Sequence, residues 1–153
     1  MKSVLIVCTG NICRSPLAVI IMKRDLEKKA PGISYNISSA GTGAWEGKSA
    51  SEGAYLVAIE NSLDVSDHRA NLLTRELIDR SDVVFTMARH HRLRVQELGG
   101  EGKVFLLGEY AGLSGDEAEV ADPYGGDITV YRETYQELET VIGLVVDRMV
   151  AKQ

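Results

Sequence analysis

Cysteine is scarce in this sequence of 153 residues, which contains only Cys8 and Cys13. Two cysteines are too few for a disulfide framework and suit a reducing compartment. Long apolar runs are also lacking, since none approaches the roughly 20 residues that a membrane-spanning helix needs. The opening residues turn too soon into glycine and asparagine to form a signal peptide. We therefore expect a cytoplasmic protein that does not act at a membrane.

The sequence also lacks a concentration of positive charge. Its 17 lysines and arginines are outnumbered by 22 acidic residues, which gives a net charge of −5. A surface for nucleic acid or anionic lipid needs a positive stripe, so neither partner is expected. Internal repeats and linkers are missing as well, while the hydrophobic content of 44% is that of an ordinary globular protein. Residues 1–153 are expected to form one domain.

Short apolar strands are predicted at four places along the chain. Unbroken runs rich in β-branched residues indicate strands buried on both faces at 3–7, 82–87 and 103–107. Alternation of apolar and polar residues over 33–39 predicts a strand with one wetter face, at a sheet edge.

Helical segments separate these strands. The first is expected to begin with Ser15 as its N-cap and Pro16 at its first position. Other helices are expected at 54–61, 74–80, 89–98 and 131–149, and a long loop at 108–126. The order of elements predicts an α/β fold with a four-stranded parallel sheet flanked by helices on both faces. A ligand should bind outside the carboxyl ends of the strands.

The segment CTGNICR at 8–14 joins the first strand to the first helix. In such a loop, successive backbone N–H groups can converge on an anion such as phosphate. Gly10 and Asn11 tolerate the left-handed backbone that the curvature requires. Arg14 adds a planar fork that can bind two phosphate oxygens. The predicted phosphate-binding residues are Thr9, Gly10, Asn11, Ile12, Cys13 and Arg14.

Cys8 stands at the start of this loop. The amides, the helix dipole and Arg14 would stabilise its thiolate, which could attack phosphorus in line with the leaving group. One alternative is a buried structural cysteine beside a surface arginine. Another is a zinc site, but zinc would need two further ligands and the three histidines lack a suitable pair spacing. We expect a nucleophile, with no metal and no cofactor.

The residues VCTGNICRSP at 7–16 resemble the phosphate loop of the low-molecular-weight protein tyrosine phosphatases. The similarity continues through 39–42, Trp45, 67–70 and 122–125, and so covers almost the whole chain. The resemblance implies a hydrolase that acts on phosphorylated proteins through a cysteinyl-phosphate intermediate and releases inorganic phosphate.

The same resemblance assigns a general acid and a supporting shell. Asp122-Pro123 alone is only a turn signal, but it matches the family's general acid, which would protonate the leaving group and later activate water. Ser15, Ser39 and His68 match the family's hydrogen-bonded support of the loop. Read without the resemblance, they are a helix cap, a strand-end serine and a core histidine.

Ile12, Trp45 and Tyr124 match positions that wall the family's substrate slot. Without the resemblance, each is more typical of a protein core. Cys13 corresponds to the second cysteine of the family's loop, which can form a reversible disulfide with an oxidised Cys8. Otherwise Cys13 is a small buried hydrophobic residue.

The substrate is the least determined feature. Residues 87–91 (MARHH) and Gly125 resemble the bacterial protein-arginine phosphatases, whereas the tyrosine-acting branch commonly has an aspartate and a second aromatic there. Ile12 favours phosphotyrosine instead, because an isoleucine offers apolar contact to a phenyl ring and no hydrogen bond to a guanidinium. We predict phosphotyrosine, with phosphoarginine as the alternative. An arsenate reductase would need a further cysteine, and a non-catalytic phosphate-binding module would not need both Cys8 and Asp122.

Overall fold

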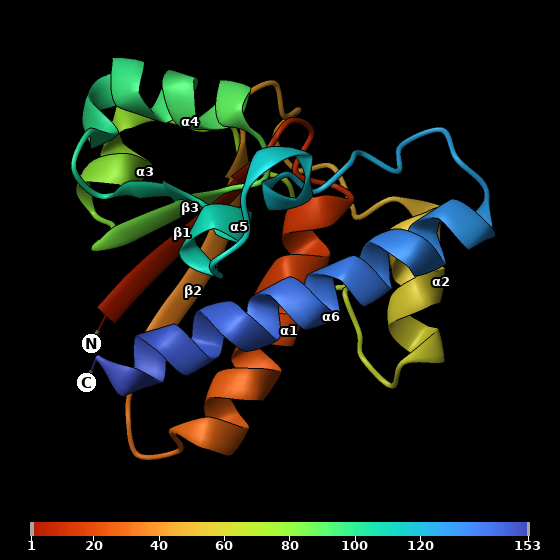
Figure 1. Cartoon of the computed structure of the whole chain (residues 1–153). Helices are drawn as coiled ribbons and strands as arrows, with labels where there is room; N and C mark the ends of the chain where they lie inside the picture. Colours follow the sequence, from red (N-terminus) through yellow and green to blue (C-terminus); the bar gives the residue numbers. More distant parts are fainter. Residues whose placement is uncertain (1, 153) are drawn as a thin grey trace.

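A computed structural model describes residues 2–152 of the chain (Figure 1). Its four parallel strands form one sheet in the order β2-β1-β3-β4. The strands are β1 (Lys2–Cys8), β2 (Tyr35–Gly41), β3 (Val83–Thr86) and β4 (Val104–Leu106). The predicted four-stranded parallel sheet is confirmed, and the second strand lies at its edge as predicted.

Helices cover both faces of the sheet, as predicted (Figure 1). They are α1 (Arg14–Lys29), α2 (Glu52–Glu60), α3 (Arg75–Asp79), α4 (Arg89–Val95), α5 (Leu107–Tyr110) and α6 (Ile128–Ala151). Two short turns complete the set: the π-type η1 (Gln96–Gly100) and the 3-10 η2 (Gly115–Ala118). Helices α1 and α6 pack together on one face, and α3 and α4 lie over the other.

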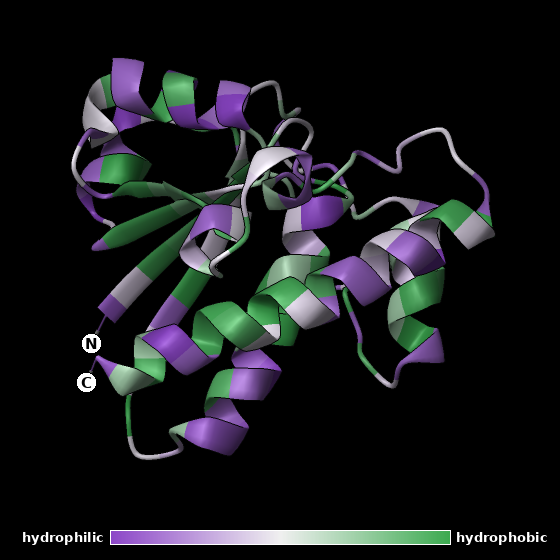
Figure 2. Ribbon diagram, viewed as in Figure 1, coloured by the Kyte–Doolittle hydropathy of each residue, from purple (hydrophilic) through white to green (hydrophobic). Residues whose placement is uncertain are grey.

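Strand β1 is apolar on both sides because it contributes to two separate cores. Val4, Ile6 and Cys8 belong to the core beneath α1 and α6, while Leu5 and Val7 belong to the core beneath α3 and α4. This division follows from the two-residue period of a strand. Figure 2 shows apolar residues along the strands, while the outer helices carry both apolar and polar residues. Burial on both faces fixes β1, and with it the position of Cys8.

Helix α6 packs on one face of the sheet through a single apolar stripe of side chains. The side chains that were predicted to form it are all buried: Tyr131, Tyr135, Leu138, Ile142, Val145 and Met149. The helix begins after Asp127, whose carboxylate accepts a hydrogen bond from the N–H of Val130 at 3.2 Å. Such a cap satisfies one of the free N–H groups at a helix start. The stripe and the cap together place the segment before α6 beside the end of β1.

Three local predictions were wrong. Helix α1 begins at Arg14 rather than after Ser15, because the Ser15 hydroxyl bonds to loop side chains and caps nothing. The second strand starts two residues late, since Ile33 is 39% exposed and pairing with β1 begins at Tyr35. The expected loop over 108–126 contains most of α5 and all of η2.

No helix within residues 2–152 combines the length and the apolar character that crossing a membrane requires.

Candidate functional site

The loop between β1 and α1 turns its carbonyl groups outward and keeps its N–H groups free. Three of these carbonyls accept hydrogen bonds from neighbouring segments: Cys8 from Thr42 N–H at 3.0 Å, Thr9 from Gly43 N–H at 3.0 Å, and Ile12 from Ser51 N–H at 2.8 Å. Within residues 2–152, the N–H groups of residues 9–13 donate to no other group. Unpaired donors of this kind at a helix start form an anion-binding concavity.

Asn11 holds the curvature of this loop. Its φ of 57° lies in the left-handed region, which costs an ordinary residue about 1–2 kcal/mol. Its side-chain amide donates to Ser15 Oγ at 2.7 Å and to Ser39 Oγ at 2.9 Å, and its Oδ1 accepts from the Asn71 N–H at 2.8 Å. His68 Nε2 donates to the Asn11 carbonyl at 2.5 Å. The structure thus brings Ser15, Ser39 and His68 together around one strained residue.

His68 and Ser39 have the environments that this arrangement requires. Burial lowers the pKa of His68, and a neutral ring still donates from Nε2 while its other nitrogen stays unprotonated. His68 is only half-buried, so its reading as a core histidine was wrong. Ser39 is buried near the end of β2, beside the loop.

Residues 8–14, which form this concavity, are called the cradle below. Cys8 lies at its base, with 2% of its surface exposed. Its Sγ is 3.0 Å from Ser15 Oγ. Because that hydroxyl oxygen already accepts from the Asn11 amide, its own hydrogen is left to donate to the sulfur. A hydrogen bond donated to sulfur favours the thiolate over the thiol.

Thr9 is oriented by His91, a histidine that was not predicted to lie at the site. His91 is completely buried, and its Nδ1 accepts from the Ala88 N–H at 3.1 Å. The ring hydrogen therefore sits on Nε2 and is donated to Thr9 Oγ1 at 2.8 Å. Burial, aided by the charges of His90 and Arg14, lowers the pKa of His91 to about 3, so the ring stays neutral.

The position of His91 was a signal that could have been used. It follows the carboxyl end of β3, and ligands of parallel α/β sheets bind at that edge. Because Thr9 Oγ1 accepts from His91, its own hydrogen remains available to an anion in the cradle.

Arg14 closes the cradle from the first position of α1, where 4% of its surface is exposed. Its Nη1 donates to the Val120 carbonyl at 2.9 Å, and its Nη2 lies 3.4 Å from Thr9 Oγ1. Within residues 2–152, its buried Nε has no hydrogen-bond partner. A buried guanidinium donor left without a partner is suited to an anion that enters the cradle.

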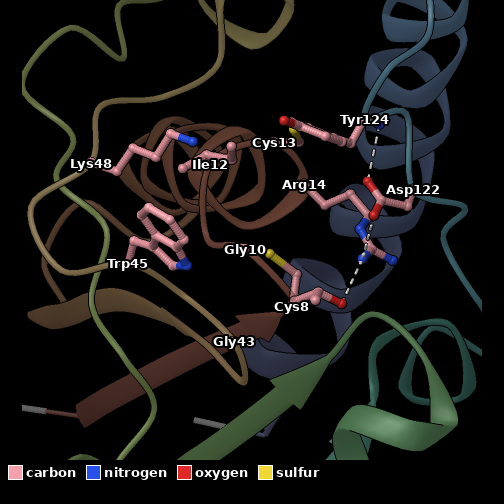
Figure 3. A pocket seen from close by; sticks show the side chains of 11 residues that line it. Cys8, Gly10, Ile12, Cys13, Arg14, Gly43, Trp45, Lys48, Asp122 and Tyr124 are labelled. Atoms are coloured by element: carbon pink, nitrogen blue, oxygen red, sulfur yellow. Dashed lines mark hydrogen bonds and ion pairs between the residues drawn. The ribbon is translucent and has the colours of Figure 1, made fainter.

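Asp122 stands at the mouth of the cradle, with about half of its side chain exposed. Its Oδ2 is 3.6 Å from Arg14 Nη2, and its Oδ1 accepts from the Tyr124 N–H at 3.1 Å. Pro123, which is buried, restricts Asp122 to extended backbone. The carboxylate is thus held above the loop that carries Cys8 (Figure 3).

Cys13 faces a different environment from Cys8. Its Sγ lies 3.3 Å from both Ser51 Oγ and Tyr131 Oη. Burial raises the pKa of the Cys13 thiol, and it raises that of Tyr131 to about 12. Cys13 is therefore held as a neutral thiol, which leaves Cys8 as the better nucleophile of the two. Neither Ser51 nor Tyr131 was predicted to lie at the site.

A pocket of about 430 Å³ opens above the loop. Its walls include Ile12, Trp45 and Tyr124, as predicted from the resemblance. Trp45 and Tyr124 are 78% and 66% exposed, so the alternative of two core aromatics was wrong. The lining residues Gly43 and Lys48 were not predicted to lie at the site.

The arrangement has the parts of a phosphoryl-transfer site. Free amides and Arg14 can hold three phosphate oxygens, Cys8 Sγ lies at the base, and Asp122 faces the opening. Within residues 2–152, no group of three or more histidine, cysteine or acidic side chains is placed to hold a metal ion.

Comparison with known proteins supports this description. Residues 3–153 match the family described as low molecular weight phosphotyrosine protein phosphatase. A protein-arginine-phosphatase of Geobacillus stearothermophilus is 37% identical over 152 residues, covering 98% of this chain and 97% of its own. The low molecular weight protein-tyrosine-phosphatase Wzb of Escherichia coli K12 is also 37% identical, over 140 residues, 90% of this chain and 88% of its own.

The fold is also similar to that of a solved structure. The arginine phosphatase YwlE from Geobacillus stearothermophilus superposes with a TM-score of 0.88 at 35% identity, covering 100% of this chain and 96% of that one.

Proposed function

The chain belongs to the low molecular weight phosphotyrosine protein phosphatase family, and from this premise we propose that it hydrolyses phosphotyrosine in proteins, with Cys8 as nucleophile. The family consists of cysteine-dependent phosphoric monoester hydrolases, and the chain is one of them. What remains to be assigned is the role of each side chain and the identity of the phosphorylated residue.

In the first step, the Cys8 thiolate attacks phosphorus while the bond from phosphorus to the leaving oxygen breaks. Arg14 and the amides of residues 9–13 hold the three equatorial oxygens, and Thr9 adds its hydroxyl hydrogen. Protonated Asp122 gives its proton to the departing phenolate, since it stands at the mouth from which the leaving group exits. The products are a dephosphorylated tyrosine side chain in the protein substrate and a cysteinyl phosphate on the enzyme.

In the second step, water replaces sulfur on phosphorus. Asp122, now a carboxylate, takes a proton from the attacking water and regains its acid form. The bond from sulfur to phosphorus breaks, inorganic phosphate leaves, and Cys8 returns to the thiolate that Ser15 supports. No metal or cofactor takes part in this proposal.

The proposal of phosphotyrosine as the substrate rests on the apolar contact that Ile12 offers. Ile12 lines the pocket with 8% of its surface exposed, and it lies on the same side as Trp45 (Figure 3). A phenyl ring between these side chains gains apolar contact. A guanidinium at the same place would find no acceptor in Ile12, and an unpaired buried donor costs about 1–3 kcal/mol.

Phosphoarginine is the second candidate, favoured by Gly125 and by the relative named above. Gly125 has a φ of 83° and is exposed beside the pocket residue Tyr124, so it adds no second aromatic ring there. The 37% identical relative is a protein-arginine-phosphatase, as is the structure with the TM-score of 0.88.

The test compares kcat/KM of the purified protein for two peptides of one sequence that carry phosphotyrosine or phosphoarginine. A higher value for phosphotyrosine supports the proposal. A higher value for phosphoarginine overturns the argument from Ile12 and assigns the second function.

We also propose that the protein is located in the cytoplasm and that peroxide inactivates it reversibly. Both cysteines are free thiols, as suits the cytoplasm. Peroxide would convert Cys8 to a sulfenic acid, and the Cys13 thiol would then displace water to form a disulfide. Mass spectrometry of the oxidised protein tests this step, and sulfinic acid at Cys8 without linkage to Cys13 would contradict it.

A further inference from the structure

Lys48 is a cation at the pocket that the proposed reaction does not use. Its side chain lines the pocket and is exposed. Within residues 2–152, no carboxylate lies within ion-pair distance of its ammonium group. The nearby Glu46 carboxylate instead accepts a hydrogen bond from the Leu72 N–H at 2.5 Å.

The backbone around Lys48 is fixed, so its side chain starts from a defined place at the pocket. Lys48 N–H donates to the Trp45 carbonyl at 3.2 Å, which closes a tight turn, and Gly47 in that turn has a φ of 81°. The turn is tied to Ala70 from both sides: Gly47 N–H donates to the Ala70 carbonyl at 2.9 Å, and Ala70 N–H donates to the Lys48 carbonyl at 2.8 Å. The ammonium group lies 5.9 Å from the centre of the Trp45 ring.

Lys48 does not belong to the cradle. It lies at the rim of the pocket, which is formed by Trp45, Lys48, Asp122 and Tyr124. Figure 3 places Lys48 on the side of Trp45 and beside Ile12, with Asp122 and Tyr124 on the other side. The phosphate has its own donors at the base, where Arg14 is 4% exposed and the loop amides are free. A cation at the rim therefore meets what lies beyond the phosphorylated side chain, namely the peptide that carries it.

We propose that Lys48 binds the carboxylate of an aspartate or glutamate next to the phosphorylated residue of a protein substrate. The inference rests on the proposed function and names a feature of the substrate. An extended peptide advances about 3.3 Å per residue, so a flexible lysine can reach side chains one or two positions away. The net charge of −5 disfavours acidic peptides elsewhere on the protein, and Lys48 offers them a local attraction.

The experiment measures kcat/KM for two phosphotyrosine peptides that differ only in carrying aspartate or asparagine on both sides of the phosphotyrosine. We expect wild type to favour the aspartate peptide about two- to fivefold, as an exposed ion pair allows. Lys48→Ala should abolish the preference, and Lys48→Glu should reverse it. The preference of wild type should shrink with added salt.

Two controls separate this inference from its alternatives. Lys28→Glu makes the same charge change near the far end of α1, about 21 Å of helix from Arg14, and should keep the wild-type preference. p-Nitrophenyl phosphate has no flanking residue, so Lys48→Ala should hydrolyse it at the wild-type rate.

Each contrary result has a distinct meaning. Equal use of both peptides by wild type, or an unchanged preference in Lys48→Ala, overturns the assignment of Lys48. A matching loss on p-nitrophenyl phosphate also overturns it, because Lys48 would then act on the phosphate. Failure of wild type to hydrolyse either peptide, with p-nitrophenyl phosphate still cleaved, would instead overturn the proposed choice of phosphotyrosine.

Discussion

The cradle, residues 8–14, and the rim, formed by Trp45, Lys48, Asp122 and Tyr124, are built in opposite ways. In the cradle, Asn11 has no exposed surface and bonds to four other residues through its side chain and carbonyl. At the rim, Trp45 is 78% exposed and Tyr124 is 66% exposed. The cradle is held by buried hydrogen bonds, while the aromatic side chains of the rim are exposed to solvent.

This difference matches two separate tasks. Phosphoryl transfer needs donors that are fixed before the substrate arrives, because reorganising them would raise the barrier. Recognition of a protein substrate needs side chains that can adapt to neighbouring residues, and such contacts are individually weak. Changes in the cradle should therefore affect every substrate alike, whereas changes at the rim should affect some substrates more than others.

The largest effect is expected from Cys8→Ser. Serine has no stable anion at neutral pH, so turnover should fall by at least about 10⁴-fold. The amides and Arg14 remain, so inorganic phosphate should still bind, as titration calorimetry can measure. Residual turnover above a hundredth of wild type would point to another nucleophile.

Asp122→Asn should show that one rim residue takes part in the chemistry. Asparagine can still accept from the Tyr124 N–H but cannot donate a proton as an acid, so phenyl phosphate should lose about 10²–10³-fold in kcat. An aryl phosphate with a strongly activated leaving group should lose far less. The measurement is kcat across a series of leaving groups, and equal losses along the series would remove Asp122 from the acid role.

His91→Asn tests whether the cradle depends on His91, which bonds to Thr9. Asparagine can keep the bond to the Ala88 N–H but does not reach Thr9, so kcat/KM should fall about tenfold for all substrates. His90→Asn is the matched control, because His90 is exposed and bonds to neither group. A variant of His91 that impairs only peptide substrates would contradict the uniform behaviour expected of the cradle.

The low pKa of His91 gives the same variant a stability signature. A histidine whose pKa falls from 6.5 when unfolded to about 3 when folded contributes stability above pH 6.5 and loses it as the pH falls towards 3. Across that window, wild type should lose up to about 1.4 kcal/mol per pH unit more than His91→Asn. Urea unfolding at several pH values measures this difference, and parallel curves would contradict the assignment.

The smallest effect on turnover is expected from Ile12→Thr. This residue is the exception in the cradle, because its apolar side chain walls the pocket and should affect the choice of substrate rather than turnover in general. Threonine would offer an acceptor to a guanidinium and less apolar contact to a ring, so the ratio of kcat/KM for phosphotyrosine over phosphoarginine should fall about tenfold. Ile12→Val is the control for lost volume and should change the ratio little. An unchanged ratio in Ile12→Thr would show that Ile12 does not select the substrate.

The predictions from sequence succeeded where the residues of a single segment are enough to determine its local structure. The apolar run before Cys8, the glycine and asparagine after it, and Arg14 at the helix start are local features, and they indicate a strand, a curved loop and an anion site. The sheet followed from the alternation of strands and helices, because parallel strands require helical crossovers. The start of α1 was misjudged because a serine beside a proline has the composition of a cap, whereas its hydroxyl is used by Asn11 and Cys8.

The sequence by itself determined the fold class and the loop between β1 and α1, and it supplied the proposed nucleophile at the start of that loop. Only the tertiary structure decided which distant residues meet there: His91 bonds to Thr9 across 82 positions, and Tyr131 approaches Cys13 across 118. It also decided that Lys48 and Asp122 lie at one pocket. The physical reason is that such contacts depend on how the strands are ordered and how the helices pack on them, and no local pattern along the chain records the distance between side chains from separate elements.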